Sequence, residues 1–212
     1  MQKTFSVYLL TYVLAMGALA LLFGYPKAEL HLLLNSCHTP AADTFFRYYS
    51  TLAEWPFYVI GLLPLCFKRW RWTVFFGLSE GVGALLVQIV KRIFRAPRPV
   101  VFFEDYPDVT LPLVEGVRMH HSNSFPSGHT NSFFIFYTVC ALLLAWHYGR
   151  KGRSAAWGLT LLPLLAMAFL GGYSRIYLSQ HFFLDTYVGS LIGMATPCLM
   201  FWFFKDKIVC ER

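Results

Sequence analysis

The segment FFLDTYVGSLIGMATPCLMFWFF, residues 182–204, decides the fold class, because Asp185 is its single charged residue. A helix of about 20 apolar residues is long enough to cross the hydrocarbon core of a bilayer. Five earlier stretches have a similar character, so the sequence predicts six membrane-spanning helices in one bundle. The predicted spans are 5–24, 52–67, 73–92, 130–147, 155–173 and 182–204.

The composition agrees with a membrane protein. Hydrophobic residues make up 57% of the 212 residues and charged residues 14%, whereas soluble domains are about 25% charged. Aromatic residues reach 18%, and Trp and Tyr near segment ends are typical of interfacial belts. We predict an all-α polytopic membrane protein in which residues 1–212 form a single domain.

The first two predicted spans need separate interpretation, because the first could be a signal peptide and the second is short. No convincing small-residue cleavage site follows the first apolar run, so we interpret it as a retained helix rather than a signal peptide. The second span is short and carries Trp55-Pro56 near its start. Between the two, KAELHLLLNS (27–36) has the pattern of an interfacial amphipathic helix.

The distribution of Lys and Arg predicts the orientation. With six spans, the termini and the loops 68–71 and 150–153 share one side and carry ten of the 18 basic residues. The loops of the other side carry eight, of which at least three belong to the site described below. The positive-inside rule then places both termini in the cytoplasm and the longest loop, 93–129, outside.

The net charge of +7 and the five cysteines point to no other class of protein. No motif or basic face indicates nucleic-acid binding. The cysteines are odd in number and lack C-x-x-C spacing, so we interpret them as small buried apolar residues.

The first polar cluster is KRIFRAPRP, residues 91–99. Lys91 lies near the predicted end of the third span, and Arg98 lies just beyond it, where Pro97 and Pro99 end the helix. Such cations can bind a phosphate. The alternative is that they only extend to lipid head groups from a helix end.

The second cluster is FPSGHTNS, residues 125–132, at the start of the fourth span. Ser127 or Thr130 can cap the helix, and Gly128 lets a ligand approach the backbone closely. His129 lies at a helix N-terminus, where free N–H groups favour anions. A simple helix cap with a surface histidine is the alternative.

The third cluster is SRIYLSQHFFLD, residues 174–185. We expect Arg175 in the short turn after the fifth span and His181 at the start of the sixth. Asp185 is four residues on, where its carboxylate can accept an imidazole N–H and fix the tautomer of His181. A structural His–Asp pair beside an arginine at the head groups is the alternative.

The predicted topology brings all three clusters to one membrane face. Cations, a helix N-terminus, two histidines and one carboxylate suit a phosphoryl group, because the cations bind its oxygens while one histidine attacks and another supplies a proton. A metal site would need more carboxylates or histidines. We therefore expect no metal and no cofactor.

The motifs K-x6-RP (91–99), PSGH (126–129) and SR-x5-H-x3-D (174–185) together resemble the signature of the type-2 phosphatidic acid phosphatase superfamily. This superfamily includes lipid phosphate phosphatases, phosphatidylglycerolphosphate and undecaprenyl pyrophosphate phosphatases, lipid A phosphatases and soluble vanadium haloperoxidases. The six apolar spans separate this chain from the haloperoxidases.

The resemblance implies a role for each motif residue. His181 is implied as a nucleophile that forms a phosphohistidine, Asp185 as its orienting partner and His129 as the general acid. The implied phosphate ligands are Lys91, Arg98, Ser127, the Gly128 N–H and Arg175.

The predicted function is metal-independent hydrolysis of a membrane lipid phosphate at the outer face of a bacterial inner membrane. Undecaprenyl pyrophosphate, lipid A, phosphatidylglycerolphosphate and phosphatidic acid are all compatible substrates. A protein that only binds or translocates a lipid phosphate is the alternative, although it would not need a nucleophile. The expected partners are the substrate and the bilayer, without nucleic acid, and the sequence does not predict the oligomeric state.

Some polar residues lie outside the motifs. Glu80 and Gln88, inside the third span, are either functional or paired with a neighbouring helix. The loop 100–125 is interpreted mainly as solvated surface, although some of its polar residues can reach a head group or the mouth of the site. These are Glu104, Asp105, Asp108, Arg118, His120 and His121.

Overall fold

The computed structural model describes residues 2–54, 56, 58, 60, 66, 67, 69–150 and 155–209. Within these residues every regular element is a helix, which confirms the all-α prediction. The elements are α1 (Gln2–Ala20), η1 (Leu21–Gly24), α2 (Lys27–Leu34), α3 (Pro40–Thr51), α5 (Trp70–Phe94), α6 (Pro99–Phe102), η2 (Phe103–Asp105), α7 (Gly128–Arg150), η3 (Ala155–Leu161), α8 (Leu162–Tyr177) and α9 (Phe183–Val209).

Within the described part of the chain, five segments are long and apolar enough to cross a membrane, so the chain is an integral membrane protein. They are Lys3–Gly24, Trp70–Asp105, Gly128–Gly149, Trp157–Tyr177 and Phe183–Lys207. The predicted second span, 52–67, lies largely outside the described residues, and the count of six therefore remains a prediction.

The segment between the first two predicted spans contains two helices. The helix predicted at 27–36 is present as α2, while its location at the membrane interface stays a prediction, and a further helix, α3, follows it. Thr39 caps α3 by accepting the Ala42 N–H at 3.2 Å, and Pro40 begins it, both favoured at a helix start. The prediction that Arg175 occupies a turn is wrong, because α8 continues to Tyr177 and Arg175 lies in its last turn.

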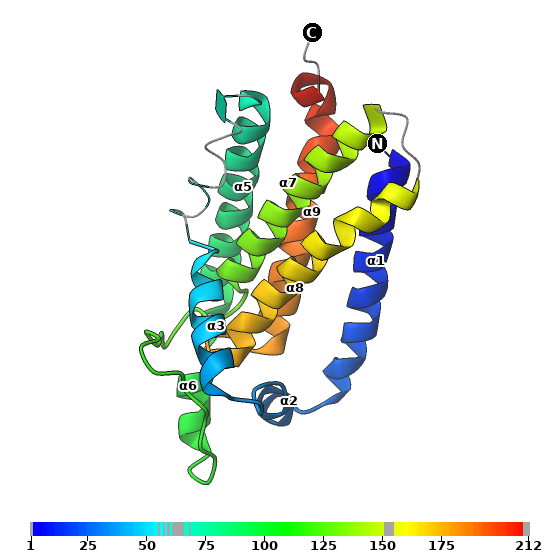
Figure 1. The fold of residues 1–212 in the computed structure, drawn as a ribbon. Coiled ribbons are helices and arrows are strands. Elements are labelled where there is room, and N and C mark those ends of the chain that lie inside the picture. Colours follow the sequence, from blue (N-terminus) through cyan, green and yellow to red (C-terminus); the bar gives the residue numbers. More distant parts are fainter. Residues whose placement is uncertain are drawn as a thin grey trace.

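Helix α7 is the centre of the bundle, in contact with α1, α5, α8 and α9 (Figure 1). Two glycines of α9 allow its backbone to lie directly against the backbone of α7. A Cβ on Gly189 would lie 2.6 Å from the Ser127 carbonyl oxygen, and one on Gly193 would lie 2.5 Å from that of Asn131. Small residues four apart let membrane helices pack backbone to backbone, so this pair fixes the start of α7 on α9.

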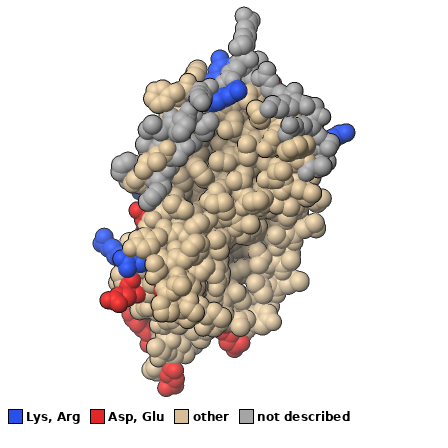
Figure 2. Space-filling model, viewed as in Figure 1, with Lys and Arg blue, Asp and Glu red and all other residues tan. Residues whose placement is uncertain are grey.

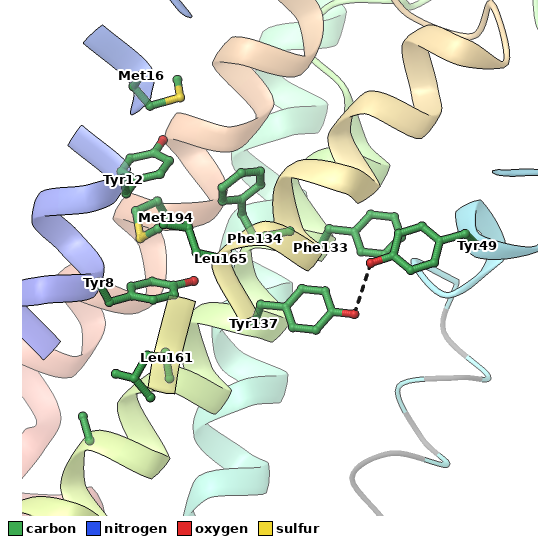
Figure 3. Close-up of a cluster of buried hydrophobic side chains, with 13 residues drawn as sticks. Tyr8, Tyr12, Met16, Tyr49, Phe133, Phe134, Tyr137, Leu161, Leu165 and Met194 are labelled. Atoms are coloured by element: carbon green, nitrogen blue, oxygen red, sulfur yellow. Dashed lines mark hydrogen bonds between the residues drawn. The ribbon is translucent and has the colours of Figure 1, made fainter. Parts of the chain in front are cut away.

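Aromatic side chains fill the core around α7 (Figure 3). Phe133, Phe134 and Tyr137 lie between α1 on one side and α3 on the other. Tyr49 of α3 stacks on Phe133 with ring centroids 5.4 Å apart, and its hydroxyl donates to the Met167 carbonyl at 2.9 Å. The polar tip of this buried ring is therefore satisfied within the protein.

The two ends of the bundle differ. Both chain termini lie at one end, while the C-terminal ends of α5 and α8 and the N-terminal ends of α7 and α9 lie at the other (Figure 1). On the face shown in Figure 2, charged side chains gather towards the ends and one edge, and a broad uncharged surface lies between them. The arrangement places the three polar clusters at one end of an apolar bundle.

Candidate active site

The three polar clusters meet at the end of the bundle opposite the termini. The Ser127 N–H donates to the Asp185 carbonyl at 2.9 Å, which joins the second cluster to the third. Arg98 donates through Nη1 to the Gln180 carbonyl at 3.0 Å and to Gln180 Oε1 at 3.1 Å, which joins the first cluster to the third. The juxtaposition expected from topology is therefore present in the structure.

His181 and Asp185 form a buried pair. His181 lies in the turn before α9 and Asp185 in its first turn, with Nδ1 and Oδ2 3.5 Å apart. The Phe182 N–H donates to the same Oδ2 at 2.9 Å. The carboxylate is thus fixed by its own turn and faces one nitrogen of the imidazole.

Ser124 is a third member of this group, which the sequence did not reveal. Its side chain is fully buried. Its hydroxyl donates to Asp185 Oδ2 at 2.5 Å and lies 3.4 Å from His181 Nδ1. Hydrogen bonds to a carboxylate stabilise its charged form, so Ser124 helps to keep Asp185 ionised and oriented.

The electrostatic surroundings keep His181 neutral. Burial lowers the pKa of His181 from 6.5 to about 3. Asp185 opposes this shift, and the nearby positive charges of Arg98 and Arg175 add to it. A neutral imidazole retains the lone pair that a nucleophile requires.

Lys91 and Arg98 are held by carbonyl groups of the loop before α7. Lys91 Nζ donates to the Asn123 carbonyl at 2.9 Å, and Arg98 Nε donates to the Ser122 carbonyl at 3.0 Å. The Arg98 backbone N–H also donates to the His121 carbonyl at 3.2 Å. The backbone carbonyls of residues 121–123 therefore hold two cations of the site, although these three residues are exposed.

Arg175 is the most deeply placed cation. Its side chain is buried, Nη1 donates to the Ser50 hydroxyl, and Nε has no hydrogen-bond partner in the described structure. An open donor on a buried cation is costly unless an anion or water fills it. The guanidinium is thus suited to an anionic ligand.

The N-terminus of α7 completes the anion site. Ser127 is the cap, since its hydroxyl accepts the Thr130 N–H at 3.3 Å and the Thr130 hydroxyl at 2.9 Å. A Cβ on Gly128 would meet nothing nearer than Val87, at 3.8 Å. Protein packing therefore does not require glycine there, and the open space leaves backbone N–H groups accessible to a phosphate.

His129 lies in the first turn of α7 and is half-buried. It is within electrostatic range of Arg175, His181, Arg98 and Lys91. All eight residues that the sequence assigned to the site are consequently brought to one region.

Helix α2 adds two residues that sequence reasoning did not place at the site. His31 is buried against Phe103 and Phe182, and burial lowers its pKa to about 4. Lys27 Nζ lies 3.7 Å from the centroid of the Phe182 ring. Both side chains are close enough to Asp185 for its negative charge to interact with them electrostatically.

Some of the remaining polar residues form hydrogen bonds within the protein, and others are exposed on its surface. Glu80 accepts a hydrogen bond from the Ser132 hydroxyl at 3.0 Å, so it pairs with a neighbouring helix. Gln180 Nε2 donates to the Arg118 carbonyl at 3.2 Å. Partial burial and, to a smaller extent, nearby cations lower the pKa of His120. The acidic side chains of the loop are exposed, namely Glu104, Asp105 and Asp108.

Among the described residues, no group of three or more His, Cys, Asp or Glu side chains is arranged to hold a metal ion. The donors at the site are instead cationic or backbone N–H groups. Their shared property is affinity for oxyanions.

Comparison with known proteins gives a consistent family. Residues 72–208 match the model of the PAP2 superfamily. Human dolichyldiphosphatase 1 is 30% identical over 82% of this chain and 71% of its own length. The Bacillus licheniformis bacitracin transport permease protein BcrC is 34% identical over 45% of this chain, and the match spans 41% of BcrC.

A solved structure is similar over the whole chain. The first transmembrane PAP2-type phosphatidylglycerolphosphate phosphatase from Bacillus subtilis is 25% identical, with a TM-score of 0.66 and full coverage of both chains.

Proposed function

Because the chain belongs to the PAP2 superfamily, we propose that it is a metal-independent membrane lipid phosphatase. Its reaction is hydrolysis of a lipid phosphomonoester or pyrophosphate through a phosphohistidine intermediate. The observation that carries the proposal is the buried pair of His181 and Asp185, placed beside buried arginines and the open N-terminus of α7.

Binding is assigned to the cations and the helix terminus. Lys91, Arg98 and Arg175 neutralise the non-bridging oxygens, and Ser127 and the Gly128 N–H donate to them. Preorganised donors of this kind stabilise developing charge, and removing one typically costs about 10²–10³-fold in rate.

The first chemical step is attack on phosphorus. With Nδ1 of His181 facing Asp185, Nε2 is the nitrogen that forms the N–P bond. The bond from phosphorus to the leaving oxygen breaks, and His129 gives that oxygen a proton. Asp185 stabilises the positive charge that develops on the imidazole.

The second step releases phosphate. Water attacks the phosphohistidine, the N–P bond breaks, and the water proton passes to His129. Both histidines are thereby returned to their starting states, as reversal of the acid's role between two half-reactions requires.

The substrate is a long-chain lipid phosphate at the outer face of the membrane. The families of the similar proteins favour a polyprenyl pyrophosphate or phosphatidylglycerolphosphate, and lipid A and phosphatidic acid have the same phosphate chemistry. The outer face is supported by the Lys and Arg count together with the position of both termini at the end away from the site (Figure 1).

A second function is favoured by one comparison. The name of the similar protein BcrC describes transport, and a chain that only binds or moves a lipid phosphate would also need cations. Such a protein does not require the His181–Asp185 pair, and covalent phosphorylation of His181 distinguishes the two functions.

The test is phosphate release by the purified protein in EDTA, from undecaprenyl pyrophosphate, lipid A, phosphatidylglycerolphosphate and phosphatidic acid. We expect turnover of at least one lipid and an acid-labile phosphohistidine in rapidly quenched wild type. His181→Ala should show neither, while His147→Ala, an exposed histidine at the far end of α7, should retain both. Normal turnover by His181→Ala, or strict dependence on Mg²⁺, would overturn the mechanism.

A further inference from the structure

An apolar cavity of about 200 Å³ lies beside the site, between α1, α2, α7, α8 and α9. Most of its wall is aliphatic or aromatic. The lining side chains include Met16, Leu19, Leu22, Leu34, Phe169 and Ile176. Two residues of this wall, Met16 of α1 and Phe134 of α7, are labelled in Figure 3.

The cavity adjoins the phosphate site through two threonines. Thr130 follows His129 and Thr186 follows Asp185, and both line the cavity. The Thr130 hydroxyl donates to Ser127 at 2.9 Å, while its methyl group lies on the side of Gly172, which also lines the cavity. One residue therefore contacts the phosphate-binding cap and the apolar space together.

The hydroxyl groups on the wall are already used by the protein. Thr186 and Ser190 donate to carbonyls of their own helix at 2.8 and 2.7 Å. Tyr173 and Tyr187 donate to the carbonyls of Leu34 and Met16 at 3.0 and 3.2 Å. With its donors satisfied, the cavity suits hydrocarbon and does not suit a polar head group.

Part of the wall comes from outside the region that matches the family. Met16, Leu19, Leu22 and Leu34 precede residue 72, where the family match begins. This part of the cavity is thus contributed by the N-terminal segment of this chain.

We propose that this cavity holds the phosphate-proximal part of the substrate's hydrocarbon chain, and that residues 16–34 help to select the chain. The proposal rests on the proposed lipid phosphatase function. Because the bilayer is itself apolar, burial in the cavity adds little affinity. Its contribution is placement, and a displacement of about 1 Å at a reacting centre can cost about 10²-fold in rate.

The test introduces a bulky side chain into the cavity and leaves the residues of the proposed active site unchanged. Leu22→Trp adds bulk at the half-buried wall, and Leu21→Trp is the matched control, because Leu21 is 79% exposed and absent from the lining. The substrates are undecaprenyl pyrophosphate and dioleoyl phosphatidic acid, each paired with a counterpart that lacks the hydrocarbon chain, namely inorganic pyrophosphate and glycerol 3-phosphate. We expect Leu22→Trp to lower kcat/KM for the long-chain lipids by about ten- to hundredfold relative to Leu21→Trp and to leave hydrolysis of the chainless counterparts nearly unchanged.

Leu19→Trp is a second filling variant, with exposed Leu14→Trp as its control, in case Leu22→Trp does not fold. Equal kcat/KM values for the long-chain lipids in the filling variants and their controls would overturn the cavity assignment. Wild type inactive on all four substrates would instead overturn the proposed function.

Discussion

At the scale of single residues, Asp185 Oδ2 is shared between Ser124, the Phe182 N–H and His181. Because the distance to His181 Nδ1 is 3.5 Å while Ser124 lies at 2.5 Å, the serine is the firmer partner in this state. In the proposed mechanism, its hydroxyl therefore acts through the carboxylate, as a positioning group.

Ser124→Ala should lower kcat by about ten- to hundredfold, since a hydrogen bond to a charged group contributes about 1.5–3 kcal/mol. KM should change little, because Ser124 is not assigned to bind substrate. Ser124→Thr retains the hydroxyl and should recover much of the activity. A Ser124→Thr protein as slow as Ser124→Ala would argue that the residue acts through packing alone.

The depressed pKa of His181 predicts how stability depends on pH. In the unfolded chain the imidazole titrates near 6.5, whereas in the folded protein its pKa is about 3. The unfolded state therefore binds more protons between these values, and stability present above about pH 6.5 is lost as pH falls towards 3. The midpoint of thermal unfolding should fall from pH 7 to pH 5, and it should fall less in His181→Asn. An equal fall in both proteins would show that other groups, such as His31, dominate.

The motif residues could be predicted because each has a local signature, such as cations beside Pro97 and Pro99 or a helix start at PSGH. Ser124 and His31 could not, since their roles depend on contacts with residues 57 or more positions away. No local pattern distinguishes such a serine or histidine from one on a surface.

At the scale of elements, two glycines of α8 explain why one predicted boundary is wrong. The predicted fifth span, 155–173, ends directly after Gly171-Gly172, and glycine weakens a helix. In the structure the helix continues, and a Cβ on Gly171 would collide with the Phe133 ring. These glycines permit close packing on α7, a long-range role that the sequence does not separate from helix termination.

Gly189→Ala tests the packing that holds the site together. Its Cβ would lie 2.6 Å from the Ser127 carbonyl oxygen and would push α7 away from α9. We expect a loss of about 1–3 kcal/mol in stability and a fall in kcat, because Ser127 and Asp185 would separate. Gly81→Ala is the control, since a Cβ there meets nothing within 4 Å and alanine favours the helix. Stability and kcat can be measured on the same detergent preparation, and unchanged values in Gly189→Ala would contradict this account.

At the scale of the whole molecule, the bundle has one end that carries the proposed active site and another that carries both termini (Figure 1). The sequence predicted this polarity because an even number of spans returns the chain to its starting side. The difference of ten against eight basic residues is small. Three of the eight, Lys91, Arg98 and Arg175, lie in the site, and with these set aside the bias favours cytoplasmic termini.

Two native cysteines allow the orientation to be measured. Cys37 is exposed between α2 and α3, at the end of the proposed active site (Figure 1), and Cys66 is exposed just before the basic loop 68–71. The interpretation of the cysteines as buried residues is therefore wrong for these two. In variants that retain one cysteine each, with serine at the others, a membrane-impermeant maleimide should label Cys37 in intact cells. Cys66 should be labelled only after permeabilisation, because the basic loop beside it is predicted to face the cytoplasm. The reverse pattern would place the site at the inner face, and it would leave the phosphohistidine chemistry to be judged separately by the His181→Ala protein.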